Sequence, residues 1–281
     1  MQIGIRLHDV EKGTIEHRAE VAAAQGFKCA HIALSKLSNY KMSSTSELTP
    51  GWACHLKRTF SEQKVDIAVL GCYLNLANPD PEALKKIQNV YKAHLRFASI
   101  LGAGVVGTET GAPNVEYKAV PECHGEEALE SFINGLRPVV KAAEDFGVIM
   151  AVEPVFKHIM WNPARTRKVL DAIDSPNLQV IFDPVNLLDI SNYQNRDEIF
   201  AEAIETFGND VAMIHIKDFI VKDGKLESVA AGTGEMDYSR ILKFAKEKKP
   251  FVHATLENTV PDNAVAAREF IQKKYDEIII E

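Results

Sequence analysis

The chain has 281 residues, a formal net charge of −7 and an isoelectric point near 5.8. Its hydrophobic content of 46% and charged content of 25% are those of a globular domain, which excludes a disordered tail, a collagen-like fibre and a small disulfide scaffold. The acidic balance argues against a nucleic-acid-binding surface, because such surfaces are normally basic.

Eight short apolar runs rich in β-branched residues recur along the chain. In chain order the predicted strands are 3–7, 31–34, 67–73, 105–108, 149–152, 179–182, 212–216 and 251–256. Between them, helices are predicted over 16–25, 81–101, 126–146 and about 196–207, each followed by a glycine that we expect in the left-handed conformation. Most of the apolar runs are continuous, as in parallel strands covered on both faces.

The number and spacing of these runs indicate the fold class. Eight strand–helix units in 281 residues average about 35 residues each, the size of one βαβ unit. We therefore predict an α/β fold in which residues 1–281 form a single (β/α)8 TIM barrel domain. The alternative, a doubly wound sheet, needs a glycine-rich phosphate turn that opens a helix, and GAGVVG at 102–107 instead lies before and within a predicted strand.

The cellular location is inferred from what the sequence lacks. No stretch reaches the roughly 18 apolar residues that span a bilayer, and MQIGIRLHD has neither the basic nor the apolar region of a signal peptide. The cysteines Cys29, Cys54, Cys72 and Cys123 are far apart and form no CxxC pair. We therefore expect reduced thiols and a cytoplasmic protein with no membrane partner.

Acidic residues and one histidine recur at the ends of five successive predicted strands. These residues are Glu109, Glu153, Asp183, His215 and Glu257, separated by 30 to 44 residues. Since the active site of such a barrel lies at the C-terminal ends of the strands, they meet at one rim. Clustered carboxylates repel one another unless a cation lies among them, and mixed oxygen and nitrogen ligands suit Mn²⁺, Mg²⁺ or Co²⁺. We expect the last four to bind one divalent metal, although each alone is equally consistent with a helix cap or a rim salt bridge.

Short motifs surround these residues in a characteristic order. They are AVEP at Glu153, IFDPVN at Asp183, HIKD at His215 and LEN at Glu257, with GTGEMDY at 232–238. Through them nearly the whole chain resembles the xylose isomerase-like TIM barrels, the sugar isomerase/epimerase group that includes the ketose 3-epimerases. The resemblance implies that the four residues ligate one metal ion, with Mn²⁺ favoured and Mg²⁺, Co²⁺ or Zn²⁺ compatible, and that Glu153 and Glu257 also move protons. It implies a homo-oligomer as well.

Two carboxylates on opposite sides of a keto-sugar, together with a Lewis acid, suit proton transfer through an enediolate. The leading hypothesis is therefore a metal-dependent isomerase or epimerase acting on a ketose or a related keto-sugar. The alternative is a lyase on the same barrel, either a keto-inositol or dehydroshikimate-type dehydratase or a subunit that cleaves C-glycosides. A barrel nuclease is disfavoured by the acidic charge and the few rim ligands in the first four strands, and a non-catalytic sugar-binding protein by the intact pair of glutamates.

The expected substrate contacts lie around the metal ligands. Lys217 follows His215 by two residues and therefore shares its face of the strand. The other candidates end strands or follow them: His158, Glu109, Asn186, His8 and Tyr73. Because FKHIMW at 156–161 departs from the usual sequence of the ketose 3-epimerases, the identity of the sugar stays open.

Overall fold

The apolar runs form the strands of one closed barrel, whose chain the computed structural model describes over residues 1–280. All eight predicted strands are present within two residues of their expected bounds. They are β1 (Gln2–Arg6), β2 (Cys29–Ile32), β3 (Asp66–Gly71), β4 (Val105–Glu109), β5 (Ile149–Glu153), β6 (Leu178–Phe182), β7 (Val211–Ile216) and β10 (His253–Leu256). Each pairs in parallel with its neighbour in the chain, and β10 closes the ring against β1, so the predicted TIM barrel is confirmed.

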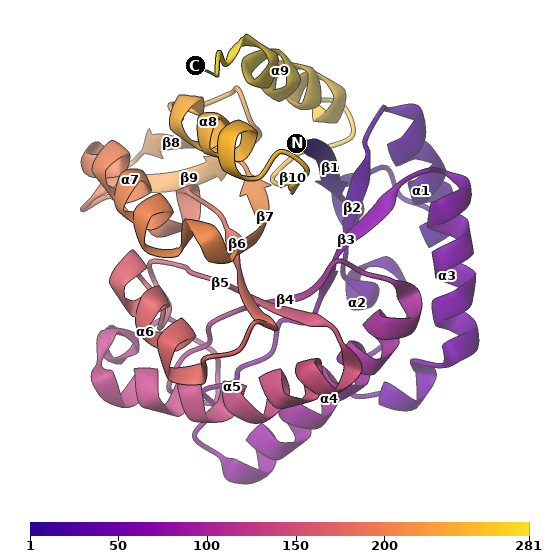
Figure 1. The fold of residues 1–281 in the computed structure, drawn as a ribbon, viewed down its shortest axis with the longest axis vertical. Coiled ribbons are helices and arrows are strands. Elements are labelled where there is room, and N and C mark those ends of the chain that lie inside the picture. The colour runs from indigo at the N-terminus through magenta and orange to yellow at the C-terminus, as the bar shows by residue number, and fades with distance from the viewer. Residues whose placement is uncertain (281) are drawn as a thin grey trace.

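Helices surround the ring of strands on its outside (Figure 1). They are α1 (Ile15–Ala24), α3 (Pro50–Glu62), α4 (Pro81–Leu101), α5 (Glu126–Phe146), α6 (Pro163–Ile173), α7 (Arg196–Phe207), α8 (Ser239–Lys248) and α9 (Ala264–Glu277), with the short α2 (Leu34–Leu37) after β2. Helices α3, α6, α8 and α9 lie beyond the four that the sequence predicted. A hairpin of β8 (Asp218–Lys222) and β9 (Lys225–Val229) is inserted directly after β7.

The ends of the predicted helices follow their capping residues. At the start of α4, the carboxylate of Asp80 accepts hydrogen bonds from two backbone N–H groups of the first turn. Gly102 and Gly147 end α4 and α5 with φ of +80° and +64°, as expected for glycine caps. The prediction for Gly208 is wrong, because its φ is −56°. A Cβ there would lie 3.1 Å from the ring of Phe244 in α8, so Gly208 packs closely against that helix.

Two apolar layers hold the barrel together. Inside the ring a compact apolar cluster is formed by side chains from the six successive strands β2 to β7: Cys29, Ala68, Val69, Val105, Ala151, Ile181 and Met213. A larger apolar layer lies between the strands and the helices. The barrel interior is thus a packed core, which leaves the C-terminal ends of the strands as the place for a site.

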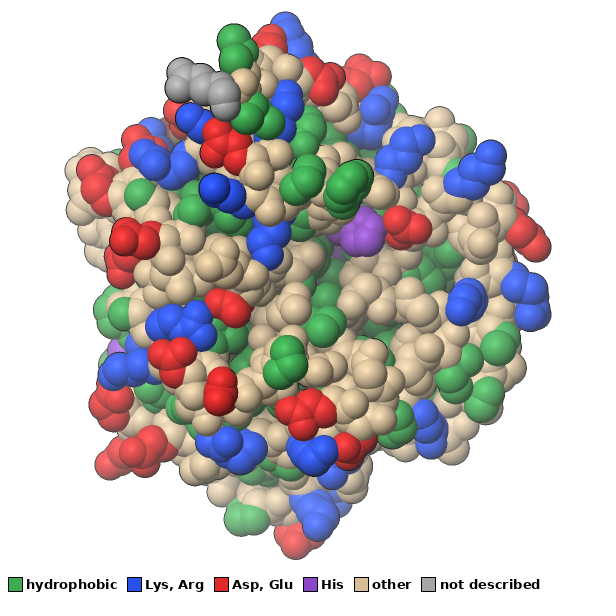
Figure 2. Space-filling view, in the orientation of Figure 1, with side chains coloured by type: hydrophobic (Ala, Val, Ile, Leu, Met, Phe, Trp, Pro, Cys, Tyr) green, Lys and Arg blue, Asp and Glu red, His purple; other side chains and the backbone are tan. Residues whose placement is uncertain are grey.

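The surface and the cysteines agree with the composition. On the face that Figure 2 shows, Lys and Arg side chains are intermingled with Asp and Glu around the periphery. All four cysteines are free. Within residues 1–280, no helix has the length and apolar character needed to cross a membrane.

Candidate active site

The C-terminal ends of four neighbouring strands bring the predicted metal ligands together. Glu153 is the last residue of β5, Asp183 directly follows β6, and His215 lies one residue before the end of β7. Glu257 directly follows β10, and its backbone N–H donates to the carbonyl of Ile216 at 2.9 Å, which ties it to β7. All four side chains are ionisable and are nevertheless buried.

Three of these residues form a compact set of possible ligands. The ligand atoms of Glu153, Asp183 and His215 all lie within 4.8 Å of one another. His215 Nδ1 is 3.1 Å from Glu153 Oε1 and 3.4 Å from Glu257 Oε1. His215 Nε2 is buried and has no hydrogen-bond partner among the described residues, which is rare for a buried polar atom. Mixed oxygen and imidazole ligands of this kind fit a divalent metal ion.

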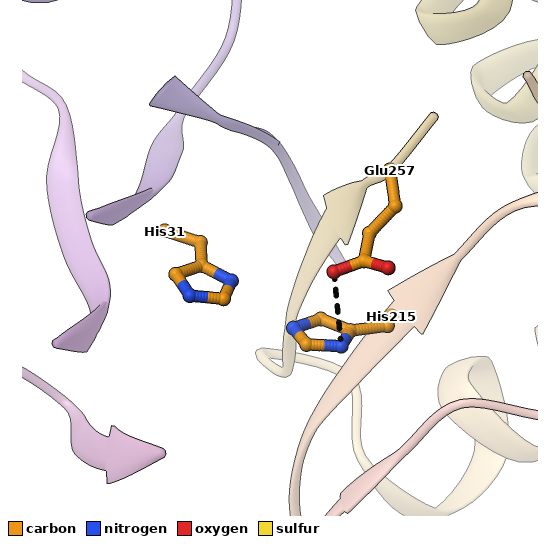
Figure 3. A group of neighbouring side chains, drawn as sticks. All are labelled: His31, His215 and Glu257. Carbon is orange, nitrogen blue, oxygen red and sulfur yellow. Dashed lines mark ion pairs between the residues drawn. The ribbon is translucent and has the colours of Figure 1, made fainter. Parts of the chain in front are cut away.

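A second group of possible ligands combines His215 and Glu257 with His31 from β2. The ligand atoms of His31, His215 and Glu257 also lie within 4.8 Å of one another, and Figure 3 shows the His31 ring opposite that of His215. The two rings are stacked, with centroids 5.3 Å apart and planes 9° from parallel, so their lone pairs do not converge as those of metal ligands do. His31 Nε2 lies 3.0 Å from the hydroxyl of Tyr73. Burial lowers the pKa of His31 well below its usual value, which keeps the ring neutral.

Lys217 and Asn186 connect the carboxylates. Lys217 Nζ lies 2.8 Å from Asp183 Oδ2 and 3.4 Å from Glu257 Oε2, and it donates to Asn186 Oδ1 at 2.7 Å. The amide of Asn186 in turn donates from Nδ2 to Glu153 Oε1 at 2.7 Å. One ammonium and one amide therefore reach all three carboxylates of the predicted metal set.

The electrostatics of the cluster follow from burial and from these contacts. Burial alone would lower the pKa of His215, but the charges of Glu153 and Glu257 outweigh it and raise the pKa to about 9. Burial raises the pKa of Asp183 to about 6, against the opposing charge of Lys217. Burial also opposes ionisation of Glu257, yet the nearby charges of His215 and Lys217 hold its pKa well below the usual range. The metal-free cluster thus contains two cations among three carboxyl groups.

A cavity of about 410 Å³ opens above this cluster. Five of the six predicted substrate contacts line it: His8, Tyr73, Glu109, Asn186 and Lys217. His8 and Tyr73 follow β1 and β3 rather than ending them, because those strands stop at Arg6 and Gly71.

The sixth predicted contact, His158, lies behind Glu109 and not on the cavity wall. His158 Nδ1 is 3.2 Å from Glu109 Oε2, and the ring is buried beside that of Tyr117. The loop after β5 turns the histidine inward, which its position in the sequence did not show. Burial raises the pKa of Glu109 to about 7, and the charge of the neighbouring Glu153 adds to this shift.

Several cavity residues were missed by sequence reasoning. They include Arg6, His31, Lys36, Tyr117 and Lys157, and Val155, Ser228 and Asn258 also line the cavity. Arg6 and His31 interrupt apolar runs near the C-terminal ends of β1 and β2, where they lie side by side in the strand register. A charged or polar residue at such a place was the available signal. Lys36 lies in the short helix α2, and Tyr117 and Lys157 lie in loops; nothing in their sequence positions points to the cavity.

Comparisons with known proteins agree with this architecture. The family model described as "Xylose isomerase-like TIM barrel" matches residues 19–274. A curated relative, the 3-oxo-isoapionate decarboxylase of Pectobacterium atrosepticum, is 28% identical over 140 residues. That match covers 47% of this chain and 46% of the relative, so it spans less than half of the relative's length.

Two solved structures share the fold over nearly their full lengths. A D-tagatose 3-epimerase-like protein superposes with a TM-score of 0.76 at 20% identity, covering 98% of this chain and 97% of its own. An IOLI protein with a bound zinc atom superposes with a TM-score of 0.74 at 17% identity, covering 98% and 96%. At these identities the likeness is one of fold.

Proposed function

The chain belongs to the xylose isomerase-like TIM barrel family, and from that premise we propose that it is a divalent-metal-dependent isomerase or epimerase of a ketose or a related keto-sugar. The observation that carries the proposal is the gathering of Glu153, Asp183 and His215 within 4.8 Å, with Glu257 beside them and a cavity above. The structural likeness to a D-tagatose 3-epimerase-like protein supports the same class of reaction.

In this proposal Glu153, Asp183, His215 and Glu257 hold the metal. When bound, a divalent metal supplies Lewis-acid polarisation of a sugar carbonyl. Mn²⁺ is the proposed ion, since carboxylates outnumber imidazoles in the set, and the zinc-bound neighbour makes Zn²⁺ the first alternative.

The chain's own residues supply the proton transfers. One of Glu153 and Glu257 removes the proton from the carbon next to the carbonyl, which produces an enediolate. The other returns a proton to the opposite face of that carbon, which inverts it, or to the neighbouring carbon, which exchanges ketose and aldose. Lys217 and Asn186 keep the two carboxylates apart and oriented through the contacts described above.

The test is solvent exchange. The metal-loaded protein is incubated in D₂O with a panel of ketoses and keto-acids and followed by NMR. Deuterium at the carbon next to the carbonyl, without loss of a fragment, is the expected result. The absence of both exchange and bound metal would refute the proposal.

Two isosteric variants test the roles of the glutamates. Glu153→Gln and Glu257→Gln should keep the fold, seen as an unchanged circular dichroism spectrum, and should lose roughly 100-fold or more of the exchange rate, the scale of general acid–base catalysis. Activity near that of the wild type in either variant would show that its carboxylate does not carry the proton.

A lyase reaction is the second candidate, and the relationship to a named decarboxylase favours it. In a decarboxylation, the C–C bond to the carboxylate breaks, CO₂ leaves, and the electron pair stays on the carbon next to the carbonyl. Glu153 or Glu257 then donates a proton to that carbon. Release of CO₂ or of water from a keto-acid in the same NMR panel would favour the lyase over the epimerase.

A further inference from the structure

The cavity contains more positive side chains than the proposed reaction uses. Arg6, Lys36, Lys157 and Lys217 all line it. Two of these are engaged: Arg6 Nε donates to Asp9 Oδ2 at 3.0 Å, and Lys217 binds the carboxylate cluster. Within residues 1–280, the ammonium groups of Lys36 and Lys157 form neither an ion pair nor a hydrogen bond, so two cations in the cavity have no protein partner.

Lys36 belongs to the same wall as Arg6. Arg6 ends β1 and Lys36 lies in α2 directly after β2, and these strands pair side by side. Burial, together with the charges of Arg6 and Lys36, lowers the pKa of the intervening His8 to about 3, so His8 is neutral at pH 7. Arg6 pairs with Asp9 and lies within ion-pair distance of Glu257, whereas Lys36 forms no ion pair with any residue from 1 to 280. Lys36 is therefore the cationic side chain of this wall that has no ion-pair partner among the described residues.

The wall adjoins the reacting end of the cavity. Arg6 Nη1 lies 3.7 Å from Glu257 Oε1, so a molecule that reaches Glu257 also reaches Arg6. Lys157, in contrast, follows β5 on the other wall, where its charge acts on Glu109. The β1/β2 wall thus offers two cationic side chains to a bound molecule, Arg6 and Lys36, and the wall after β5 offers one.

We propose that the substrate is an anionic sugar derivative whose carboxylate or phosphate binds to Lys36 and Arg6 on the β1/β2 wall. This inference rests on the proposed function, because it places the sugar carbonyl at Glu153 and Glu257. It restricts the substrate class from keto-sugars in general to keto-sugar acids or keto-sugar phosphates.

The test measures binding without turnover. Calorimetry on the metal-loaded protein compares three unreactive six-carbon ligands: neutral glucitol, gluconate and glucitol 6-phosphate. At least one of the two anions should bind roughly tenfold more tightly than glucitol, which is the effect of one hydrogen bond to a charged group. The anion that binds more tightly shows whether the site prefers a carboxylate or a phosphate. Added salt should weaken the binding of the anion and leave that of glucitol unchanged.

Two matched lysine variants locate the anion. Lys36→Met should abolish the preference, while Lys157→Met, which removes the other unpartnered lysine of the cavity, should keep it. Equal binding of all three ligands would overturn the proposal. Tight gluconate binding in both variants would also overturn it, because this result would indicate direct chelation of the metal. An equal loss of anion binding in the two variants would overturn it as well.

These outcomes are independent of the exchange experiment. If no sugar exchanges deuterium but the anion preference depends on Lys36, the proposed reaction fails and the anion site stands. If neutral ketoses exchange rapidly and Lys36→Met changes no affinity, the reaction stands and the anion site fails.

Discussion

Replacing Lys217 by methionine removes the ammonium from the centre of the carboxylate cluster and keeps most of the side-chain volume. In the metal-free protein Lys217 contacts Asp183, Asn186 and Glu257. A metal ion bound by the same carboxylates supplies the positive charge that Lys217 supplies in its absence. The variant should therefore destabilise the metal-free protein more than the metal-loaded one.

The size of the effect follows from two contributions. Without Lys217, protonation of Asp183 relieves the repulsion between the carboxylates. Asp183 has a pKa of about 6 with Lys217 present, so its protonation at pH 7 costs about 1.4 kcal/mol at most, because loss of the lysine charge raises that pKa further. Loss of the hydrogen bonds between the ammonium and charged partners adds about 1.5–3 kcal/mol. The total is about 3 kcal/mol, at the lower end of the range for breaking a buried charge cluster.

Thermal unfolding measures both states. In EDTA the midpoint of thermal unfolding of the variant should lie about 6 °C below that of the wild type, since 1 kcal/mol shifts the midpoint by about 2 °C in a chain of this size. With saturating Mn²⁺ the difference should shrink to about 2 °C, because the metal replaces the lost charge. The variant should correspondingly bind the metal about 30-fold more tightly, the equivalent of about 2 kcal/mol.

Lys141→Met is the matched control, since Lys141 is exposed on α5 and pairs with Asp145 in solvent. It should leave both unfolding midpoints unchanged. The reasoning is refuted if Lys217→Met lowers the midpoint equally with and without metal, because Lys217 and the metal would then not share the same carboxylates.

Two further predictions concern the same cluster. Since His215 has a pKa of about 9 in the metal-free protein and must lose its proton to bind a metal, metal affinity should rise about tenfold per pH unit from pH 7 to pH 9. Calorimetry in buffers of different ionisation enthalpy should detect about one released proton per metal at pH 7.5, and an affinity independent of pH would contradict this. Asn186→Ala removes the donor to Glu153 and the acceptor of Lys217, and should slow deuterium exchange by roughly tenfold to a hundredfold. An exchange rate by NMR within twofold of the wild type would exclude that positioning role.

The barrel and the gathering of Glu153, Asp183 and Glu257 at its rim were predictable because they depend on local patterns. Continuous apolar runs report strands that are buried on both faces, and eight of them at unit spacing leave few topologies. A polar residue at the end of such a run must lie at the barrel rim, which is how Glu153, Asp183 and Glu257 were found. Neither inference requires knowledge of how the strands pair.

The missed residues depend on that pairing. In a continuous apolar run, alternation does not show which residues point inward, so the direction of the Arg6 and His31 side chains could not be predicted from the strands 3–7 and 31–34. The parallel register places them side by side at the ends of β1 and β2 and brings them to the cavity. Lys36 reaches the cavity from α2 and Lys157 from the loop after β5, and the positions of both depend on how the strands before them are placed.

The ion-pair partners of Lys217 could not be predicted from the sequence either. Its spacing from His215 predicted that the two share a face of one strand and favoured a substrate contact; in the structure Lys217 directly follows β7, which ends at Ile216. The choice of partner was decided by Asp183 and Glu257, which β6 and β10 bring to either side of β7. Because the chain thereby supplies its own counter-charge, we expect the barrel to fold before any metal arrives, with the ion then competing with Lys217 for carboxylates already in place.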